Sequence, residues 1–240
     1  NKNRPNILIL LTDDQSFNTI NALGNKEIST PNIDKLVSKG FTFTHAYIMG
    51  SFSGAVCMPS RAMLMTGQYL QKLDKVQGAI GENIKTMPQL LKESGYTTFF
   101  TGKWHNRKAS FFKSFTNGEN IFMGGMSNHL KVPLYNFDPS GIYPEKNKFF
   151  KDKFSSVLFK EAAVNFLRQY DGIKPFFACV SFTSPHDPRM APEDYQKKYN
   201  TEAISLPKNF MSKHNFNNGE LIIRDENLLP FPRTKSDVKG

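Results

Sequence analysis

The stretch NILILLTDD, residues 6–14, decides the fold class. The run 7–11 is continuously apolar and has the length of one strand, so we expect a strand over residues 6–12 that is buried on both faces. Buried strands of this kind belong to mostly parallel sheets, in which ligands bind beyond the carboxyl ends of the strands. Asp13 and Asp14 follow directly, and their carboxylates are therefore expected at that end of the strand.

Alternating strand and helix patterns continue along the rest of the chain. Thr30 and Pro31 supply an N-cap and a first helical residue, and Gly40 supplies a stop. Similar patterns predict helices over residues 59–65, 86–94 and 155–170, and strands over residues 41–48, 96–101 and 175–182. This order predicts an α/β fold with a mostly parallel central sheet and helices on both faces.

Two segments, 106–153 and 184–240, lack a sustained period, and we interpret them as long irregular loops. The polar end of the chain, residues 233–240, contains no closing strand or helix. Such an end is typical of a cut inside a longer protein. We therefore expect residues 1–240 to be the N-terminal portion of a single domain, truncated before its C-terminal part.

The composition excludes several classes of protein. The formal net charge of +10 predicts attraction to anions, or simply a solvated basic surface. No Lys/Arg block, zinc-finger pattern or RNA-binding signature occurs, so we expect no nucleic acid partner. The apolar runs are far shorter than the about 18 residues of a membrane span. No signal-peptide pattern opens the chain, so any export signal was removed or never present.

Two cysteines, Cys57 and Cys179, are too few for a disulfide framework. Cys179 lies in the apolar run PFFACVSF and is expected to be a core residue. Cys57 opens CMPSRAMLMTG, residues 57–67, in which Pro59 suits the first turn of a helix. Residue 57 should therefore lie just before a helix N-terminus, where free N–H groups favour an anion, with Arg61 one turn further on. The alternative is a buried cysteine in front of an ordinary helix.

Two further motifs follow predicted strands. The motif GYTTFFTGKWH, residues 95–105, brings Lys103 and His105 to the end of one strand, and SPHDP, residues 184–188, does the same for His186. In an open α/β sheet these side chains would meet the two aspartates at one edge. The plainer alternatives are an exposed lysine, a surface histidine and a simple turn.

Together these motifs resemble the formylglycine-dependent sulfatases of the alkaline-phosphatase superfamily. Residues 57–67 match the family signature Cys-x-Pro-Ser-Arg followed by Thr-Gly, and residues 95–105 resemble its second signature. The resemblance implies that a formylglycine-generating enzyme oxidises Cys57 to formylglycine. It also implies that Asp13, Asp14 and residue 57 bind a divalent metal, usually calcium, with magnesium as the alternative. An acidic turn or a helix cap is the other interpretation of the aspartates.

The resemblance further implies a mechanism for the hydrolysis of sulfate esters. One hydroxyl of the hydrated formylglycine attacks sulfur, while the metal and Lys103 offset the growing charge. His186 protonates the departing alcohol, and His105 takes a proton from the second hydroxyl, which expels sulfate and restores the aldehyde. Arg61 would brace residue 57 or a bound sulfate. Export to the periplasm, the extracellular space or a lysosome-like compartment is expected.

The family pattern is incomplete in this sequence, because its Asp-Asn pair and a further active-site lysine cannot be placed. We therefore expect an incomplete metal site and only the N-terminal portion of a sulfatase catalytic domain. Two alternatives stay open. One is a phosphomonoesterase or phosphonate hydrolase of the same superfamily, and the other is an inactive relative that binds glycans.

The expected substrate class is a sulfated glycan. The segment 106–153 combines basic residues with aromatic side chains that could stack on sugars: Phe111, Phe112, Phe115, Tyr135 and Tyr143. The plainer alternative is that these aromatics pack the segment against the domain. His129 and His214 lie in the irregular segments and are further candidates for contact with substrate.

Overall fold

The computed structural model describes residues 4–52, 55–74, 77–206 and 208–211. It divides into two compact units, residues 1–16 with 43–190 and residues 17–42 with 191–240. Every residue expected to take part in catalysis or metal binding belongs to the first unit, which therefore carries the candidate site. His214 lies outside the described residues.

The first unit is built around a four-stranded sheet with the strand order β1-β4-β2-β3. Its strands, parallel in every pair, are β1 (Ile7–Asp13), β2 (Thr97–Lys103), β3 (Asn117–Phe122) and β4 (Phe176–Pro185). The positions of β1, β2 and β4 confirm the strands predicted over residues 6–12, 96–101 and 175–182. Their parallel pairing confirms the predicted α/β class.

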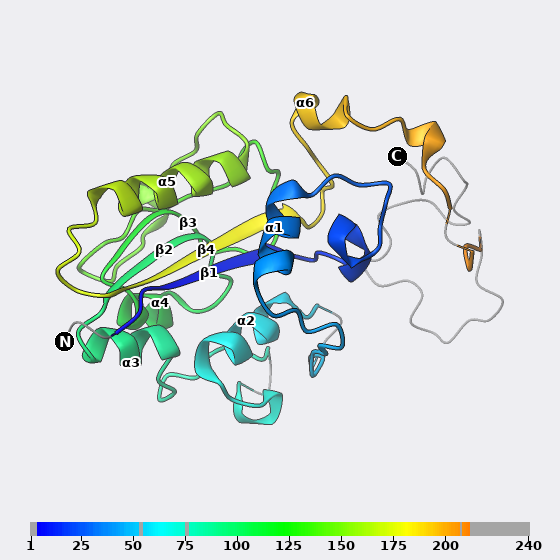
Figure 1. The fold of residues 1–240 in the computed structure, drawn as a ribbon. Coiled ribbons are helices and arrows are strands. Elements are labelled where there is room, and N and C mark those ends of the chain that lie inside the picture. The colour runs from blue at the N-terminus through cyan, green and yellow to red at the C-terminus, as the bar shows by residue number, and fades with distance from the viewer. Residues whose placement is uncertain (1–3, 53–54, 75–76, 207, 212–240) are drawn as a thin grey trace. The chain divides into compact units, whose positions relative to one another are not determined.

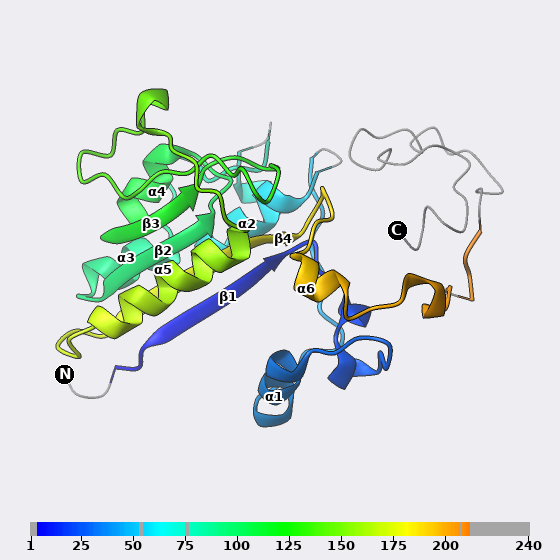
Figure 2. The same ribbon diagram turned by 90° about the horizontal axis from the view of Figure 1, so that it is seen from above.

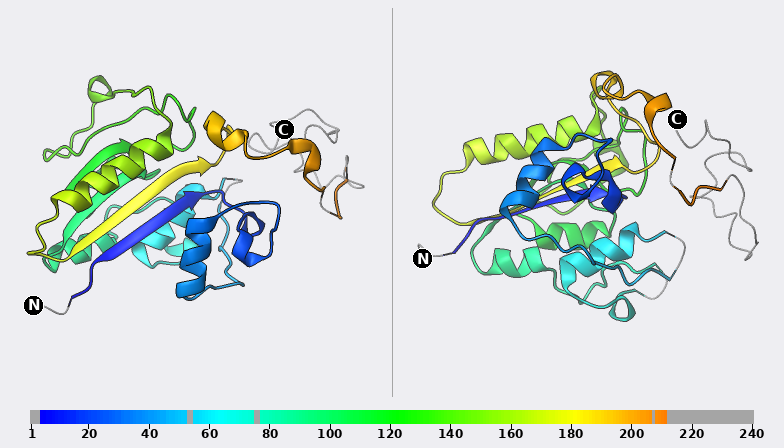
Figure 3. Two further views of the ribbon diagram at one scale, coloured as in Figure 1. Left: turned by 45° about the horizontal axis from the view of Figure 1, so that its top comes forward. Right: turned by 45° about the vertical axis from the view of Figure 1, so that its right-hand side comes forward.

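Helices cover both faces of this sheet, as expected. They are α2 (Cys57–Thr66), α3 (Met87–Glu93), α4 (Lys108–Ser114) and α5 (Ser155–Gln169), with the short 3-10 helices η3 (Leu70–Lys72) and η4 (Glu145–Asn147). In Figure 1, α5 lies above the strands and α3 and α4 lie below them. Figure 2 shows α5 running along the strands, and the right-hand view of Figure 3 keeps α2 on the opposite side of the sheet from α5.

Successive side chains of a strand point to opposite faces, and they supply a separate core on each face. Phe100 of β2 packs edge-on against Trp104 and Phe111, with ring centroids 5.5 and 5.4 Å apart. Its neighbour Phe99 stacks on Phe166 of α5, with centroids 4.3 Å apart. Because both faces are covered in this way, β2 is almost wholly buried.

Strand β1 is buried on one face only. Ile7 and Ile9 pack against the core cluster that contains Phe100, whereas Leu8 is 47% and Leu10 54% exposed. The expected burial of this strand on both faces is therefore wrong for the described structure. β1 stands at one end of the strand order. A continuously apolar run does not indicate which of its faces is covered.

Residues 41–48, predicted to be a strand, form neither strand nor helix. Their alternating pattern is that of a strand, but Phe41, Phe43 and Tyr47 are each at least 84% exposed. No described strand pairs with this segment. A strand needs a neighbour to take up its hydrogen bonds, which is why alternation alone gave a wrong prediction here.

The segment 106–153, interpreted above as irregular, contains α4 and β3. β3 has the sequence NGENIF, and its first residues are of types that are depleted in strands. Pairing with β2 makes it a strand despite this local preference. Residues 186–206 and 208–211 are closer to the expected loop, since they contain only α6 (Glu193–Gln196) and η5 (Thr201–Ala203).

The second unit contains η1 (Phe17–Thr19), η2 (Asn21–Leu23) and α1 (Pro31–Lys39), together with α6 and η5. Its two stretches of chain are joined where Ser29 N donates to Tyr199 Oη at 3.2 Å. α1 begins and ends where Thr30-Pro31 and Gly40 predicted. Across both units, no described helix combines the length and apolar character that a membrane span requires.

A glycine allows β2 to approach β4 next to the candidate site. Gly102 has φ +100°, and a Cβ atom there would lie 1.8 Å from the carbonyl oxygen of Ser181. Any side chain would therefore push the two strands apart. The following residue is Lys103, so this close approach positions the end of β2.

Candidate active site

Four candidate residues meet at the carboxyl ends of the strands. Asp13 ends β1, Lys103 ends β2, and His186 follows the last residue of β4. Because β1, β4 and β2 are parallel neighbours, these ends lie at the same edge of the sheet. Cys57 is the first residue of α2 and forms a side-chain hydrogen bond with His186, which brings it to the same edge.

A buried ionic cluster joins Asp13, Arg61 and Lys103. Arg61 Nη2 lies 3.1 Å from Asp13 Oδ1, and Lys103 Nζ lies 2.5 Å from Asp13 Oδ2. None of the three side chains is more than 6% exposed. Two cations thus face one carboxylate in a place that is shielded from water. A buried excess of positive charge is costly until an anion approaches, so the cluster is suited to bind one.

Arg61 also braces the end of β2. Its Nη1 donates to the backbone oxygen of Lys103 at 2.9 Å and to Ser181 Oγ. Ser181 Oγ in turn donates to the same Lys103 oxygen at 2.7 Å. The guanidinium group therefore holds Asp13 and the backbone of Lys103 in place. The described polar contacts of Arg61 are with Lys103, Ser181 and Asp13, and none of them is with residue 57.

Cys57 and His186 form a polarised pair. Their hydrogen bond lowers the pKa of Cys57, and the charge of Lys103 lowers it further, although burial acts in the opposite direction. The same hydrogen bond raises the pKa of His186 to about 9. His186 Nδ1 lies 3.0 Å from the backbone oxygen of Asp187, to which it donates. The pair therefore favours an anionic sulfur beside a cationic imidazole.

His105 is held in the opposite protonation state. Burial lowers its pKa to about 4, and the charges of Lys103 and Arg61 act in the same direction. Its backbone has φ +50°, and its Nδ1 is buried with no hydrogen-bond partner among the described residues. A Cβ atom at Gly125 would lie 2.5 Å from His105 Nε2, so the ring takes up space that only a glycine leaves. At neutral pH this histidine is a neutral base.

Asp14 completes the acidic pair but not a metal site. It is exposed and has φ +64°, and Asp13 beside it is already paired with Arg61 and Lys103. Among the described residues there is no group of three or more His, Cys, Asp or Glu side chains that could hold an ion. Calcium takes about six to eight oxygen ligands. The acidic pair and residue 57 therefore fit a calcium site only as part of its ligand set.

The five aromatic side chains of 106–153 that were candidates for stacking on a sugar are packed into the fold instead. Phe111, Phe115, Tyr135 and Tyr143 are buried in the core, at most 4% exposed. Phe112 is half-buried and stacks on Phe137. The plainer alternative, packing against the domain, is therefore the one that the structure shows for these residues.

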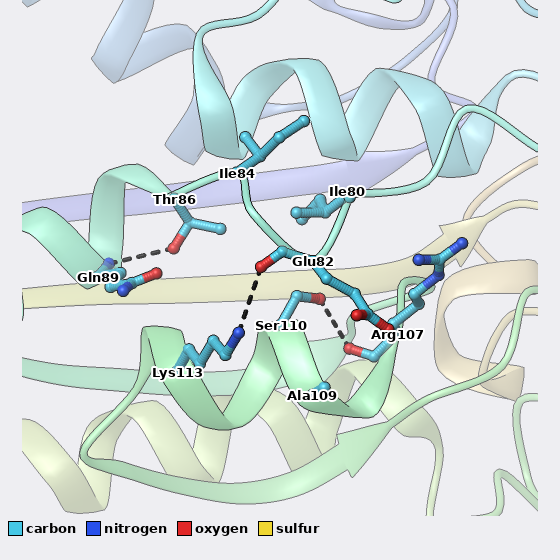
Figure 4. Close-up of a pocket in the computed structure, with 10 residues that line it drawn as sticks. Ile80, Glu82, Ile84, Thr86, Gln89, Arg107, Ala109, Ser110 and Lys113 are labelled. Atoms are coloured by element: carbon cyan, nitrogen blue, oxygen red, sulfur yellow. Dashed lines mark hydrogen bonds between the residues drawn. The ribbon is translucent and has the colours of Figure 1, made fainter. Parts of the chain in front are cut away.

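A small hollow lies away from the candidate residues, between the start of α3 and α4. Figure 4 shows Thr86, Gln89, Ser110 and Lys113 around it, with Lys113 donating to the backbone oxygen of Glu82. Its volume of about 10 Å³ is about that of one water molecule. No candidate site residue lines it, and it is too small for a substrate.

Sequence reasoning missed several residues that shape the site. Ser181 and Gly125 lie in segments without a recognisable motif, and they act through contacts with residues far away in the chain. His129 was a candidate for contact with substrate, but it is 1% exposed and therefore buried within the protein. Only the three-dimensional fold reveals such partners.

Comparisons with known proteins point to one family. A sequence-family model described as Sulfatase matches residues 5–218. The arylsulfatase of Klebsiella aerogenes is 27% identical over 219 residues, and the match covers 82% of this chain and 46% of the relative. The N-acetylglucosamine-6-O-sulfatase of Bacteroides thetaiotaomicron is 28% identical over 215 residues, covering 88% of this chain and 36% of the relative. The chain thus spans less than half the length of these curated relatives.

A solved structure has the same fold over most of the chain. BT4656, in complex with its substrate D-glucosamine-2-N,6-O-disulfate, matches with a TM-score of 0.71 at 24% identity. The match covers 86% of this chain and 40% of the solved one. At this level of identity the likeness concerns the fold.

Proposed function

The chain belongs to the sulfatase family, and from this premise we propose that the complete protein hydrolyses sulfate esters with a formylglycine made from Cys57. The observation that carries the proposal is the meeting of Cys57, His186 and the buried cationic cluster at one edge of the sheet. The family match spans both compact units, which supports their being parts of one catalytic domain.

The cationic cluster suits a sulfate group. Lys103 and Arg61 carry one more positive charge than Asp13 neutralises, and all three are fixed by hydrogen bonds before any ligand arrives. Fixed cations stabilise charge that develops on sulfate oxygens without having to reorganise. In this position the cluster both attracts the ester and lowers the barrier to attack on sulfur.

The two histidines divide acid and base work between them. The sulfur of Cys57 occupies the position that an oxygen of the hydrated formylglycine would take. The anionic form of this sulfur therefore represents the hydroxyl group that loses its proton. His186 is cationic beside it and can donate a proton to the departing alcohol. His105 is neutral and can accept a proton when sulfate is released. The hydrated aldehyde itself supplies the nucleophile, and its second hydroxyl allows sulfate to leave.

We further propose that Asp13, Asp14 and residue 57 contribute ligands to a divalent metal, calcium or alternatively magnesium. Carboxylate oxygens are the ligands that such hard cations prefer. When bound, the ion would add positive charge near the sulfate oxygens. The remaining ligands would come from outside the described residues. A formylglycine-generating enzyme as maturation partner and an exported location belong to the same proposal.

Asp14→Asn should weaken calcium binding to the complete enzyme by at least about tenfold and reduce activity in parallel, because a metal ligand loses its charge. Asp14 gives a sharper test than Asp13, whose loss would also leave Arg61 and Lys103 unpaired. Calorimetric titration of calcium and the rate of sulfate release are the measurements. The exposed Asp152→Asn is the matched control and should change neither. Full activity of the wild type in excess chelator would rule the metal out.

We propose a sulfated glycan as the substrate class. Two observations support it. The first is the net charge of +10. The second is that one relative is named as a sulfatase of an amino sugar, and that a solved structure of the same fold has a sulfated amino sugar bound as its substrate. Phe111, Phe115, Tyr135 and Tyr143 are buried in the fold and give this proposal no support. The glycan proposal therefore rests on the positive charge of the chain and on the similar proteins.

Salt tests the glycan proposal. Exposed charges are screened beyond about 10 Å at 0.1 M ionic strength, so KM for a multiply sulfated oligosaccharide should rise about tenfold between 0.05 and 0.5 M NaCl, an order-of-magnitude estimate. KM for 4-nitrophenyl sulfate should change by less than about twofold over the same range. Equal salt dependence for the two substrates would refute the glycan assignment. Faster hydrolysis of 4-nitrophenyl phosphate than of the sulfate would favour a phosphate or phosphonate ester instead.

A further inference from the structure

His129 is a buried histidine whose ring nitrogens both have polar neighbours. Its Nε2 lies 2.9 Å from the backbone oxygen of His186. A carbonyl oxygen can only accept, so Nε2 carries a hydrogen and donates it. Its Nδ1 lies 3.0 Å from Thr183 Oγ1 and 3.2 Å from Ser155 Oγ. The ring of His129 thus connects the backbone of His186 to the buried hydroxyl groups of Thr183 and Ser155.

The surroundings of His129 come from two elements and the residues next to them. Thr183 belongs to β4, and Ser155 is the first residue of α5. The Ser155 backbone N–H donates to the His129 oxygen at 2.8 Å, and the ring of Phe154 stacks on the imidazole with centroids 5.5 Å apart. The residue as a whole is only 1% exposed. It is therefore held on several sides and has little freedom to move.

His186 needs such a support. It lies just beyond the end of β4, outside the hydrogen bonds of the sheet, and its side chain is only half-buried. Its imidazole must nevertheless point at residue 57, with which it forms a side-chain hydrogen bond. Fixing the backbone oxygen of His186 fixes the point from which this side chain extends, and a misplacement of about 1 Å can cost about a hundredfold in rate.

We propose that His129 is a positioning residue, which holds the backbone of His186 so that its imidazole meets residue 57 and the departing alcohol. His129 itself does not touch the substrate, because it is buried beneath His186. This inference rests on the proposed function, since it assigns His129 a part in the same reaction.

Replacing His129 with glutamine or with asparagine separates a role in positioning His186 from a role in packing the core. A glutamine side chain can place its amide N–H close to the position of Nε2 and donate to His186. An asparagine side chain reaches only as far as Nδ1. In the complete, converted enzyme, His129→Asn should lower kcat for an alkyl sulfate by about a hundredfold and kcat for 4-nitrophenyl sulfate by less than about fivefold, because only the alkyl alcohol needs protonation to leave. KM should stay within about twofold for both substrates, and His129→Gln should restore most of the loss.

A second variant keeps the test informative if His129→Asn does not fold. Thr183→Val removes the hydroxyl that faces Nδ1 while keeping a similar shape, and it should produce a smaller loss with the same preference for the alkyl substrate. Ser114→Ala is the control, since it removes another buried hydroxyl, one bonded to Thr86, and should lower the melting temperature without changing the ratio of the two rates.

The outcomes distinguish failure of the positioning role of His129 from failure of the proposed sulfatase function. An active wild type in which His129→Asn slows both substrates equally, or in which His129→Gln is no better than His129→Asn, would overturn the positioning role alone. A converted wild type that releases no sulfate from either ester would overturn the proposed function, and the positioning role with it.

Discussion

Replacing Cys57 with alanine should abolish turnover by the complete, converted enzyme. An alanine methyl group can neither be oxidised to an aldehyde nor attack sulfur, so kcat for 4-nitrophenyl sulfate should fall by at least about four orders of magnitude. Lys103 and Arg61, which we expect to bind the sulfate group, remain in place, so substrate affinity should change far less. The rate of sulfate release and the dissociation constant of the bound ester are the two measurements.

The second cysteine provides a matched control. Cys179 is fully buried in the core, and burial raises its pKa to about 12, which leaves it a neutral thiol. Cys179→Ala should therefore lower stability by the cost of a small cavity and leave kcat nearly unchanged. Loss of activity in both variants would show a general requirement for an intact fold. It would then give no support to a special role of Cys57.

Mass spectrometry links the result to the modification. Trypsin should release the peptide 40–61, which contains Cys57 and no other cysteine. Conversion to formylglycine should make this peptide about 18 Da lighter than the cysteine form. In Cys57→Ser the hydroxyl can attack once but has no second hydroxyl to expel sulfate, so the peptide should gain about 80 Da after exposure to substrate. A fully active protein with an unmodified thiol at residue 57 would refute the formylglycine proposal.

The sequence predicted the parts of the fold that follow from local chemistry. β4 is a largely apolar run that the fold buries on both faces, and α3 begins where Thr86 Oγ1 accepts from Gln89 N at 3.1 Å. The meeting of Asp13 with Lys103 could also be predicted, because each was expected to end a parallel strand. Parallel neighbours bring such ends to one edge.

The remaining features depend on partners that are far away in the chain. β3 is a strand because β2 lies beside it, whereas residues 41–48 have a strand pattern without a described partner. Arg61 was expected to brace residue 57 or a bound sulfate, and its hydrogen bonds among the described residues go to the end of β2 and to Asp13. His129 contacts the backbone of a residue 57 positions further along. No local pattern encodes such a contact.

His186→Ala should slow the enzyme in a way that depends on the leaving group. An alkoxide is a poor leaving group and needs a proton from His186, so kcat for an alkyl sulfate should fall by about a thousandfold. A 4-nitrophenolate ion leaves without help, so kcat for 4-nitrophenyl sulfate should fall by less than about tenfold. Plotting log kcat against the pKa of the leaving alcohol for a series of esters should give a steeper negative slope for the variant. His45→Ala, at an exposed histidine, is the control and should leave the slope unchanged.

The pH dependence of the wild type adds an independent check on this role. The partner at residue 57 raises the pKa of His186, so the cationic ring persists above the ordinary titration range of a histidine. Activity on the alkyl sulfate should therefore be full while the ring is protonated and fall as the pH rises through this raised pKa. The value of about 9 holds with the Cys57 sulfur as the partner, and conversion to formylglycine replaces that sulfur with oxygen, so the direction of the shift is what carries over. The alkaline fall should be absent in His186→Ala. Equal losses on alkyl and aryl esters, or an alkaline fall that survives in the variant, would assign the proton transfer to another residue.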